Sequence, residues 1–102
     1  MPVLTVTKET IESEVMSSEK PVLLDFYAPW CGPCRMLSPV IDQIADENPE
    51  IKVVKVNVDD DPELAKKFGV TSVPTLFAFK SGKVVKKSSG ALPKQKILEM
   101  FK

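Results

Sequence analysis

Apolar and polar residues alternate along this chain in short blocks that predict strands and helices in turn. Residues 22–27, VLLDFY, would be apolar on both sides of an extended backbone except at Asp25, as in a strand in the buried middle of a parallel sheet. Ser81-Gly82 is a signal for a tight hairpin between two further strands. The other strands are predicted at 3–6, 51–58, 75–80 and 83–88.

Between the strands, apolar residues recur at helical spacing. The broadest stripe, within residues 36–45, predicts a helix that follows a turn at 28–33 and runs to about Asn48. Capping residues and apolar spacing predict shorter helices elsewhere. These are one capped by Thr7 that buries Ile11, Val15 and Met16, one from Asp61-Pro62 to Gly69, and one opened by Pro93 that buries Ile97, Leu98 and Phe101.

The resulting order, β-α-β-α-β-α-β-β-α, restricts the architecture. Strands joined by helical crossovers are parallel and right-handed, whereas the last two strands form an antiparallel hairpin. We therefore expect an α/β fold, with a central mixed five-stranded sheet flanked by four helices in a three-layer α/β/α sandwich. A length of 102 residues fits a single domain over 1–102.

Composition excludes several kinds of function. The chain has 14 basic and 14 acidic residues, so no net charge draws it onto nucleic acid or anionic lipid. Its longest apolar run, residues 76–79, has four residues, whereas a membrane helix needs about 20. The N-terminus lacks a signal-peptide pattern, and we expect a cytoplasmic protein. Without histidine, Ser-His and Cys-His catalysis and Cys/His zinc fingers are excluded.

The two cysteines, Cys31 and Cys34, lie where a strand is predicted to end and a helix to begin. Three interpretations compete. A structural disulfide closing so short a loop contributes only about 2 kcal/mol. A zinc site needs four ligands, and this chain offers two thiols unless a dimer completes it. A dithiol that cycles between reduced and oxidised forms suits the spacing and the helix N-terminus, which stabilises a thiolate, and this interpretation is favoured.

The positions of the two thiols suggest that they have different chemical roles. We expect Cys31, at an exposed turn, to attack a substrate disulfide, and Cys34, more buried in the first helical turn, to resolve the mixed disulfide. Burial raises a thiol pKa, so Cys34 needs a base. Asp25, a lone carboxylate in an apolar strand, is expected to be partly neutral near pH 7 and able to exchange a proton. The alternative is that Asp25 has only a structural role, with its carboxylate oxygens held by hydrogen bonds.

Longer motifs surround the cysteines: DFYAPWCGPC at 25–34, KVNVDDDPELAKKFGV at 55–70, SVPTLFAFKSGK at 72–83 and GAL at 90–92. With them the sequence resembles the thioredoxin family over nearly its whole length. The resemblance implies the thioredoxin fold and reduction of protein disulfides through a redox-active Cys31–Cys34 disulfide. It also implies a thioredoxin reductase and disulfide-containing proteins as partners, a monomer, and no bound cofactor or metal.

The resemblance also implies roles for other residues. Asp25 matches the buried proton acceptor of the resolving cysteine, and Lys55 matches its charge partner, although an ordinary surface lysine is an alternative for Lys55. Pro74 matches a cis proline facing the dithiol, which leaves the backbone of Val73 free to pair with a substrate strand. Where the family often has tryptophan, this chain has Tyr27.

An apolar rim around Cys31 is expected to bind exposed or partly unfolded substrates. The Gly32-Pro33 pair is also expected to set the geometry between the two sulfurs. The alternative for Trp30 is a core position, and for Gly90 a simple turn. The predicted rim residues are Trp30, Gly32, Pro33, Val73, Pro74, Gly90 and Ala91.

Two other functions fit the same motifs. One is a binding subunit that docks a partner through the rim irrespective of redox state. The other is a disulfide oxidase or isomerase, which would work in an oxidising compartment.

Overall fold

A computed structural model describes residues 3–102 of the chain, and its elements follow the predicted order. Strands and helices alternate along the sequence, except for one antiparallel hairpin of two strands near the C-terminus. The strands are β1 (Leu4–Thr5), β2 (Val22–Tyr27), β3 (Lys52–Asn57), β4 (Thr75–Lys80) and β5 (Lys83–Ser89). The helices are η1 (Glu12–Met16), α1 (Gly32–Glu47), α2 (Pro62–Lys67) and α3 (Lys94–Glu99).

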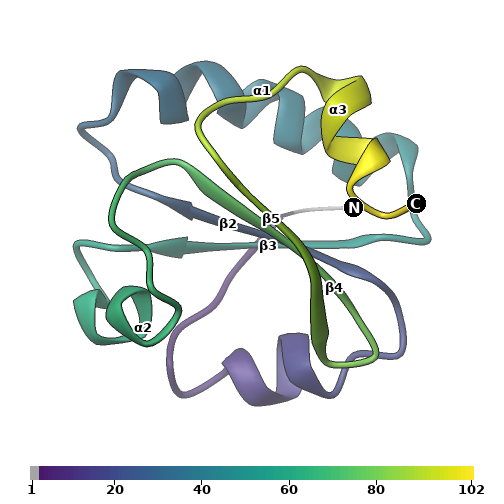
Figure 1. Cartoon of the computed structure of the whole chain (residues 1–102), viewed down its shortest axis with the longest axis horizontal. Helices are drawn as coiled ribbons and strands as arrows, with labels where there is room; N and C mark the ends of the chain where they lie inside the picture. The colour runs from purple at the N-terminus through teal and green to yellow at the C-terminus, as the bar shows by residue number, and fades with distance from the viewer. Residues whose placement is uncertain (1–2) are drawn as a thin grey trace.

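The five strands form one mixed sheet in the order β1-β3-β2-β4-β5. Strands β1 and β2 are parallel to β3, whereas β4 runs antiparallel to β2 and β5 antiparallel to β4. Helices α1 and α3 cover one face of the sheet, and α2 and the purple helix η1 cover the other (Figure 1). The predicted three-layer sandwich is confirmed.

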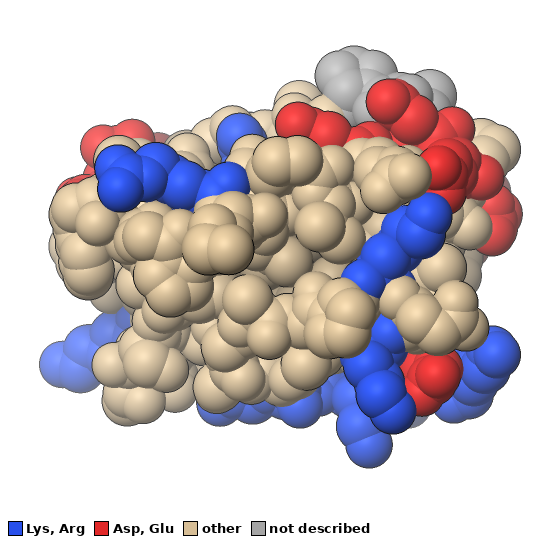
Figure 2. Space-filling model, turned by 90° about the horizontal axis from the view of Figure 1, so that it is seen from above, with Lys and Arg blue, Asp and Glu red and all other residues tan. Residues whose placement is uncertain are grey.

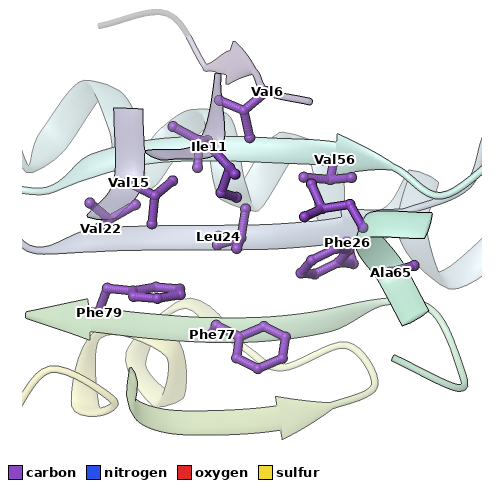
Figure 3. Packing of buried hydrophobic residues seen from close by; sticks show 12 residues of the cluster. Val6, Ile11, Val15, Val22, Leu24, Phe26, Val56, Ala65, Phe77 and Phe79 are labelled. Atoms are coloured by element: carbon purple, nitrogen blue, oxygen red, sulfur yellow. The ribbon is translucent and has the colours of Figure 1, made fainter. Parts of the chain in front are cut away.

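Alternate residues of β2 face opposite cores. Val22, Leu24 and Phe26 pack against side chains of η1, β4 and α2 in one cluster (Figure 3). Because side chains alternate along a strand, Leu23 points to the other cluster, which α1 and α3 complete. The same alternation sends Asp25 toward the α1 face of the sheet.

The first helix differs from its prediction. Over Glu12–Met16 it is a π-helix, in which the Ser17 N–H donates to the Glu12 carbonyl oxygen at 2.9 Å. Thr7 does not cap it with its side chain; instead, the Thr7 carbonyl oxygen accepts from the N–H of Ile11 at 2.8 Å. The burial of Ile11 and Val15 is nevertheless as predicted, since apolar spacing fixes the inward face but not the hydrogen-bond register.

The other predicted caps and turns are present in the structure, although some helices and strands begin or end at slightly different residues than predicted. The Asp61 side chain accepts from the Leu64 N–H at 3.1 Å and caps α2, which is followed by Gly69 at φ +69°. Ser81 and Gly82 form the hairpin turn, both with positive φ. Phe101 lies beyond the end of α3.

Gly82 is predicted to be the least replaceable of the turn glycines. A Cβ there would lie 2.6 Å from the Met16 carbonyl oxygen, whereas a Cβ on Gly69, which also has positive φ, meets open space. We expect Gly69→Ala to cost about 1 kcal/mol of unfolding free energy through backbone strain and Gly82→Ala roughly 3 kcal/mol through strain and overpacking. Urea unfolding followed by Trp30 emission measures both, and equal losses would contradict the clash.

Candidate active site

The two cysteines lie at the N-terminus of α1, where the sequence favours a helix start. Cys31 occupies the N-cap with an extended backbone, and Gly32-Pro33 supplies a proline within the first helical positions. Cys31 and Cys34 form a disulfide with their Cα atoms 5.2 Å apart. The turn therefore brings the two sulfurs within bonding reach, as the spacing predicted.

The surroundings of Cys31 favour a negatively charged sulfur. Its Sγ accepts a hydrogen bond from the Cys34 backbone N–H at 3.2 Å. It also lies at the N-terminus of a helix of 16 residues, where unpaired N–H groups carry partial positive charge. When the disulfide is reduced, both effects stabilise a Cys31 thiolate.

The predicted difference in burial between the cysteines is wrong for the disulfide form. Cys31 is 4% exposed and Cys34 is 5% exposed. The Cys31 Sγ lies 3.6 Å from the Val73 carbonyl oxygen, and both cysteines pack with Ala28. The chain segment of Val73 covers Cys31 from 42 residues away, so a local turn pattern could not reveal it.

Asp25 is a buried carboxyl on the α1 side of the sheet. It is 5% exposed, and its Oδ1 has no hydrogen-bond partner among the described residues. Burial raises the pKa of Asp25 to about 7, although the positive charge of Lys55 acts to lower it. A carboxyl with this pKa can both accept and donate a proton near neutral pH.

A small cavity of about 110 Å³ joins this carboxyl to the dithiol. Asp25 and Cys34 both line it, together with side chains from β2 and α1. A cavity of this size has room for water, for which Asp25, Ser38 and Lys55 supply polar groups. The Cys34 sulfur and the Asp25 carboxyl therefore share one cavity. The remaining lining residues include Tyr27, Arg35, Ser38 and Lys55.

Lys55 lies beside Asp25 without forming a direct ion pair. The two residues are register partners on the parallel strands β2 and β3, and no ion pair joins them within the described chain. The Lys55 Nζ instead lies 5.2 Å from the ring centroid of Tyr27, a cation–π arrangement. Lys55 thus influences Asp25 through space while its ammonium lies over the Tyr27 ring.

The Val73–Pro74 peptide bond is cis, as the resemblance implied. Immediately after it, β4 begins at Thr75, which pairs with Ser89 of β5. The Gly90 N–H donates to the Pro74 carbonyl oxygen at 2.8 Å. This contact holds the segment after β5 next to the proline segment, at the same edge of the sheet as the disulfide.

Most predicted rim residues reach the surface. Trp30 is 68% exposed, so the core alternative for it is excluded. Gly32, Pro33 and Ala91 are exposed, and Val73 and Gly90 are half-buried. Pro74, in contrast, is buried, because it directly precedes the central strand β4.

Asp59 is a contact of the rim that the sequence interpretation missed. The Trp30 Nε1–H donates to its Oδ2 at 2.9 Å. Parallel strands end at the same edge of a sheet, so the loops that follow β2 and β3 are neighbours. This topological rule, applied to a polar residue after the second strand, could have found the pair.

Every helix among residues 3–102 is too short or too polar to cross a bilayer. Over the same residues, no cluster of three or more potential metal-binding side chains occurs.

An α/β sandwich with a disulfide at a helix N-terminus and a buried carboxyl behind it defines a thiol–disulfide oxidoreductase. Comparison with known proteins agrees: the sequence model of the Thioredoxin family matches residues 2–102. The chain is 54% identical to Thioredoxin of Porphyra purpurea over 95 residues, 92% of this chain and 89% of the relative. It is 53% identical to Thioredoxin 1 of Nostoc sp. over 90 residues, 87% of this chain and 84% of the relative.

The chain belongs to the thioredoxin family. Thioredoxin of Haemophilus influenzae is similarly close, at 49% identity over 96 residues, 93% of this chain and 90% of the relative. Membership identifies the Cys31–Cys34 pair as a redox-active disulfide of a protein-disulfide reductase. It also implies disulfide-containing substrates and a reductase that restores the dithiol.

The raised pKa of Asp25 predicts how stability depends on pH. Because the carboxyl titrates near 3.8 when unfolded and near 7 when folded, the folded state holds the proton more tightly, and stability falls as pH rises from about 4 to 7. This difference between the folded and unfolded pKa of Asp25 corresponds to roughly 4 kcal/mol of unfolding free energy in total. Asp25→Asn is expected to remove this slope and to be more stable than the native chain at pH 8.

Urea unfolding of the oxidised protein across this pH range measures the effect. Asp42→Asn, at an exposed position on α1, serves as the matched control. Parallel pH profiles for native protein and Asp25→Asn would contradict a raised pKa at Asp25.

Proposed function

We propose that this protein reduces protein disulfides by an exchange that begins at Cys31. The Cys31 thiolate attacks one sulfur of the substrate disulfide, a mixed disulfide forms, and the other substrate sulfur leaves as a thiolate. Cys34 then attacks the Cys31 sulfur, which releases the second substrate thiol and closes the Cys31–Cys34 disulfide. Two electrons pass from the dithiol to the substrate, and no bound cofactor or metal takes part.

The assignment of Cys31 as nucleophile rests on hydrogen bonding rather than exposure. Its sulfur receives the Cys34 N–H and lies at the N-cap of α1. Cys34 has a place within the first turn and lines the cavity of Asp25. The thiol that has an N–H donor suits attack, and the thiol that has a nearby base suits the later step.

In the second step Asp25 acts as the proton acceptor for Cys34. Its carboxylate form takes the thiol proton through the shared cavity, and its neutral form returns a proton when the disulfide is reduced again. Lys55 tunes this exchange, because its positive charge opposes the effect of burial on the pKa of Asp25. The shared cavity of Asp25 and Cys34 is the observation that carries this assignment.

Substrate recognition in this proposal uses the backbone of Val73 and the apolar rim. The Val73 carbonyl lies next to the Cys31 sulfur, so a substrate strand that pairs there brings its own disulfide within reach. Main-chain pairing tolerates many sequences. Exposed Trp30, Ala91 and the Gly32-Pro33 pair, with half-buried Gly90, would cover the substrate around its disulfide.

The reduced state is restored by a second protein. A thioredoxin reductase supplies two electrons and two protons to the Cys31–Cys34 disulfide, as the name shared by the relatives suggests. We place this cycle in a reducing compartment, the cytoplasm, with the protein acting as a monomer.

Trapping of the mixed disulfide tests the division of roles. We expect Cys34→Ser to accumulate mixed disulfides with substrate proteins, because no second thiol is present to release them. Cys31→Ser is expected to accumulate at least tenfold fewer, since it removes the sulfur that receives the Cys34 N–H at the N-cap of α1. Non-reducing electrophoresis after incubation with insulin measures both variants, and the reverse pattern would exchange the roles.

Two further measurements separate the alternatives. Asp25→Asn is expected to retain mixed-disulfide formation and to slow its resolution about tenfold or more, as loss of a general base does. The reduction potential, read against a glutathione buffer, falls well below the glutathione pool for a reductant and above it for an oxidase. Full biological function of a Cys31→Ser/Cys34→Ser variant would instead establish a redox-independent binding subunit.

A further inference from the structure

Positive charge is concentrated in the C-terminal part of the chain, although the whole sequence is neutral. Residues 80–102 contain seven lysines and one glutamate, a net charge of +6, and residues 1–79 carry the compensating −6. On the face covered by α1 and α3, basic side chains gather mainly along one edge and acidic ones mainly along the opposite edge (Figure 2). The molecule is therefore electrically polar.

Four of these lysines follow the free edge of the sheet. Lys80 ends β4, and Lys83, Lys86 and Lys87 lie on β5, the outermost strand. All four are exposed, and no carboxylate within residues 3–102 forms an ion pair with them. This group, the lysine edge, therefore keeps a net positive charge that attracts anionic groups, although the Lys87 Nζ lies 5.5 Å from the ring centroid of Phe77.

A groove of about 290 Å³ lies next to the lysine edge, between β5 and α3. Three lysines and a single glutamate line it, together with Ser88 and two apolar residues. The glutamate, Glu99, already lies 3.8 Å from Lys96, so the groove remains net positive. The charged residues that line the groove are Lys86, Lys87, Lys96 and Glu99, and the apolar ones are Leu92 and Met100.

The lysine edge leads directly to the active-site rim. Strand β5 ends at Ser89, and the next residue, Gly90, is bonded to the Pro74 carbonyl oxygen. Lys87 precedes Gly90 by three residues, which is about 10 Å along an extended chain. A protein partner whose disulfide reaches Cys31 covers a surface of roughly 800 Å² and would therefore reach Lys86 and Lys87, whereas Lys80 and Lys83 lie at the far end of the β4–β5 hairpin.

The opposite side of the rim has the opposite charge. Asp59 and Asp60 follow β3 and are both exposed, and Asp59 is bonded to the Trp30 indole. A partner that approaches the disulfide thus meets negative charge beside Trp30 and positive charge beside Gly90. Such an arrangement favours one orientation of a charged partner over the reverse.

We propose that the lysine edge and its groove bind an acidic segment of the partner protein that lies next to the partner's disulfide. The inference rests on the proposed function and names its preferred substrate class, proteins with acidic residues flanking the reactive cystine. Attraction acts mainly on the rate of association, because exposed lysines steer encounters more than they hold a complex.

A different role for the lysines makes an opposite prediction. Charged residues on edge strands also prevent two sheets from joining. In that case their charge limits self-association and has no effect on which disulfides are reduced. The two roles are therefore separated by reaction rates with charged substrates.

The test uses peptides closed by an internal disulfide, each with a tail of about four Glu, Ser or Lys residues, long enough to span roughly 13 Å. Stopped-flow Trp30 emission gives the second-order rate constant for oxidation of the reduced protein. We expect the Glu-tailed peptide to react about tenfold faster than the Lys-tailed one at about 20 mM salt, and the difference to shrink at about 300 mM.

A matched pair of variants locates the effect. Lys86→Glu/Lys87→Glu reverses two adjacent exposed lysines of the lysine edge, and Lys66→Glu/Lys67→Glu makes the same charge change on α2. We expect the first variant to slow the Glu-tailed peptide about fivefold or more and to accelerate the Lys-tailed one. We expect the control to change either rate less than twofold.

Equal effects of the two variants would overturn the proposal, since overall charge would then explain the rates. Unchanged rates together with self-association of Lys86→Glu/Lys87→Glu, detected by light scattering, would assign the lysines to edge protection instead. The Ser-tailed peptide, whose tail is uncharged, distinguishes failure of the proposed function from failure of the lysine-edge proposal. If the native protein fails to reduce even this peptide, the proposed function fails; if it succeeds while tail charge has no effect, only the lysine edge is excluded.

Discussion

The chemistry of this protein depends on one constraint, the strict alternation of side chains along the buried strand β2. Three of its residues must fill the core under η1 and α2, and the intervening positions then face α1. Asp25 occupies one of these positions, so the strand register alone directs its carboxyl toward the helix that carries the cysteines. A shift by one residue would move the carboxyl to the opposite core.

That placement has an energetic cost which the rest of the fold must offset. A buried carboxyl without a hydrogen-bond partner on Oδ1 destabilises the folded state whenever it is ionised. Apolar packing on both faces of the sheet supplies the compensation. Lys55 reduces the cost only indirectly, because its ammonium lies over Tyr27. The cost maintains a pKa that is useful near neutral pH, as is common for groups at active sites.

Much of the fold and the central pair of the site could be predicted because their signals are local. Apolar periods, caps such as Asp61 and the Ser81-Gly82 turn lie within a few residues of what they determine. The burial of Cys31 and the bond from Trp30 to Asp59 depend instead on residues 42 and 29 positions away. No periodicity encodes such contacts, and the π-helical register of η1 escaped because α and π helices can bury the same residues.

The net charge shows a related limit on what composition can predict about the surface of the folded protein. Equal numbers of basic and acidic residues give the whole chain no net charge, but that sum does not show where the charges lie. Here the sheet order sends β5 to the edge, and the antiparallel hairpin returns the chain to the disulfide end of the sheet at Gly90. Topology therefore converts a neutral composition into opposite charges on two sides of one rim. If substrates pair with the Val73 backbone as proposed, this charged periphery is where selection among them would not restrict the exchange itself.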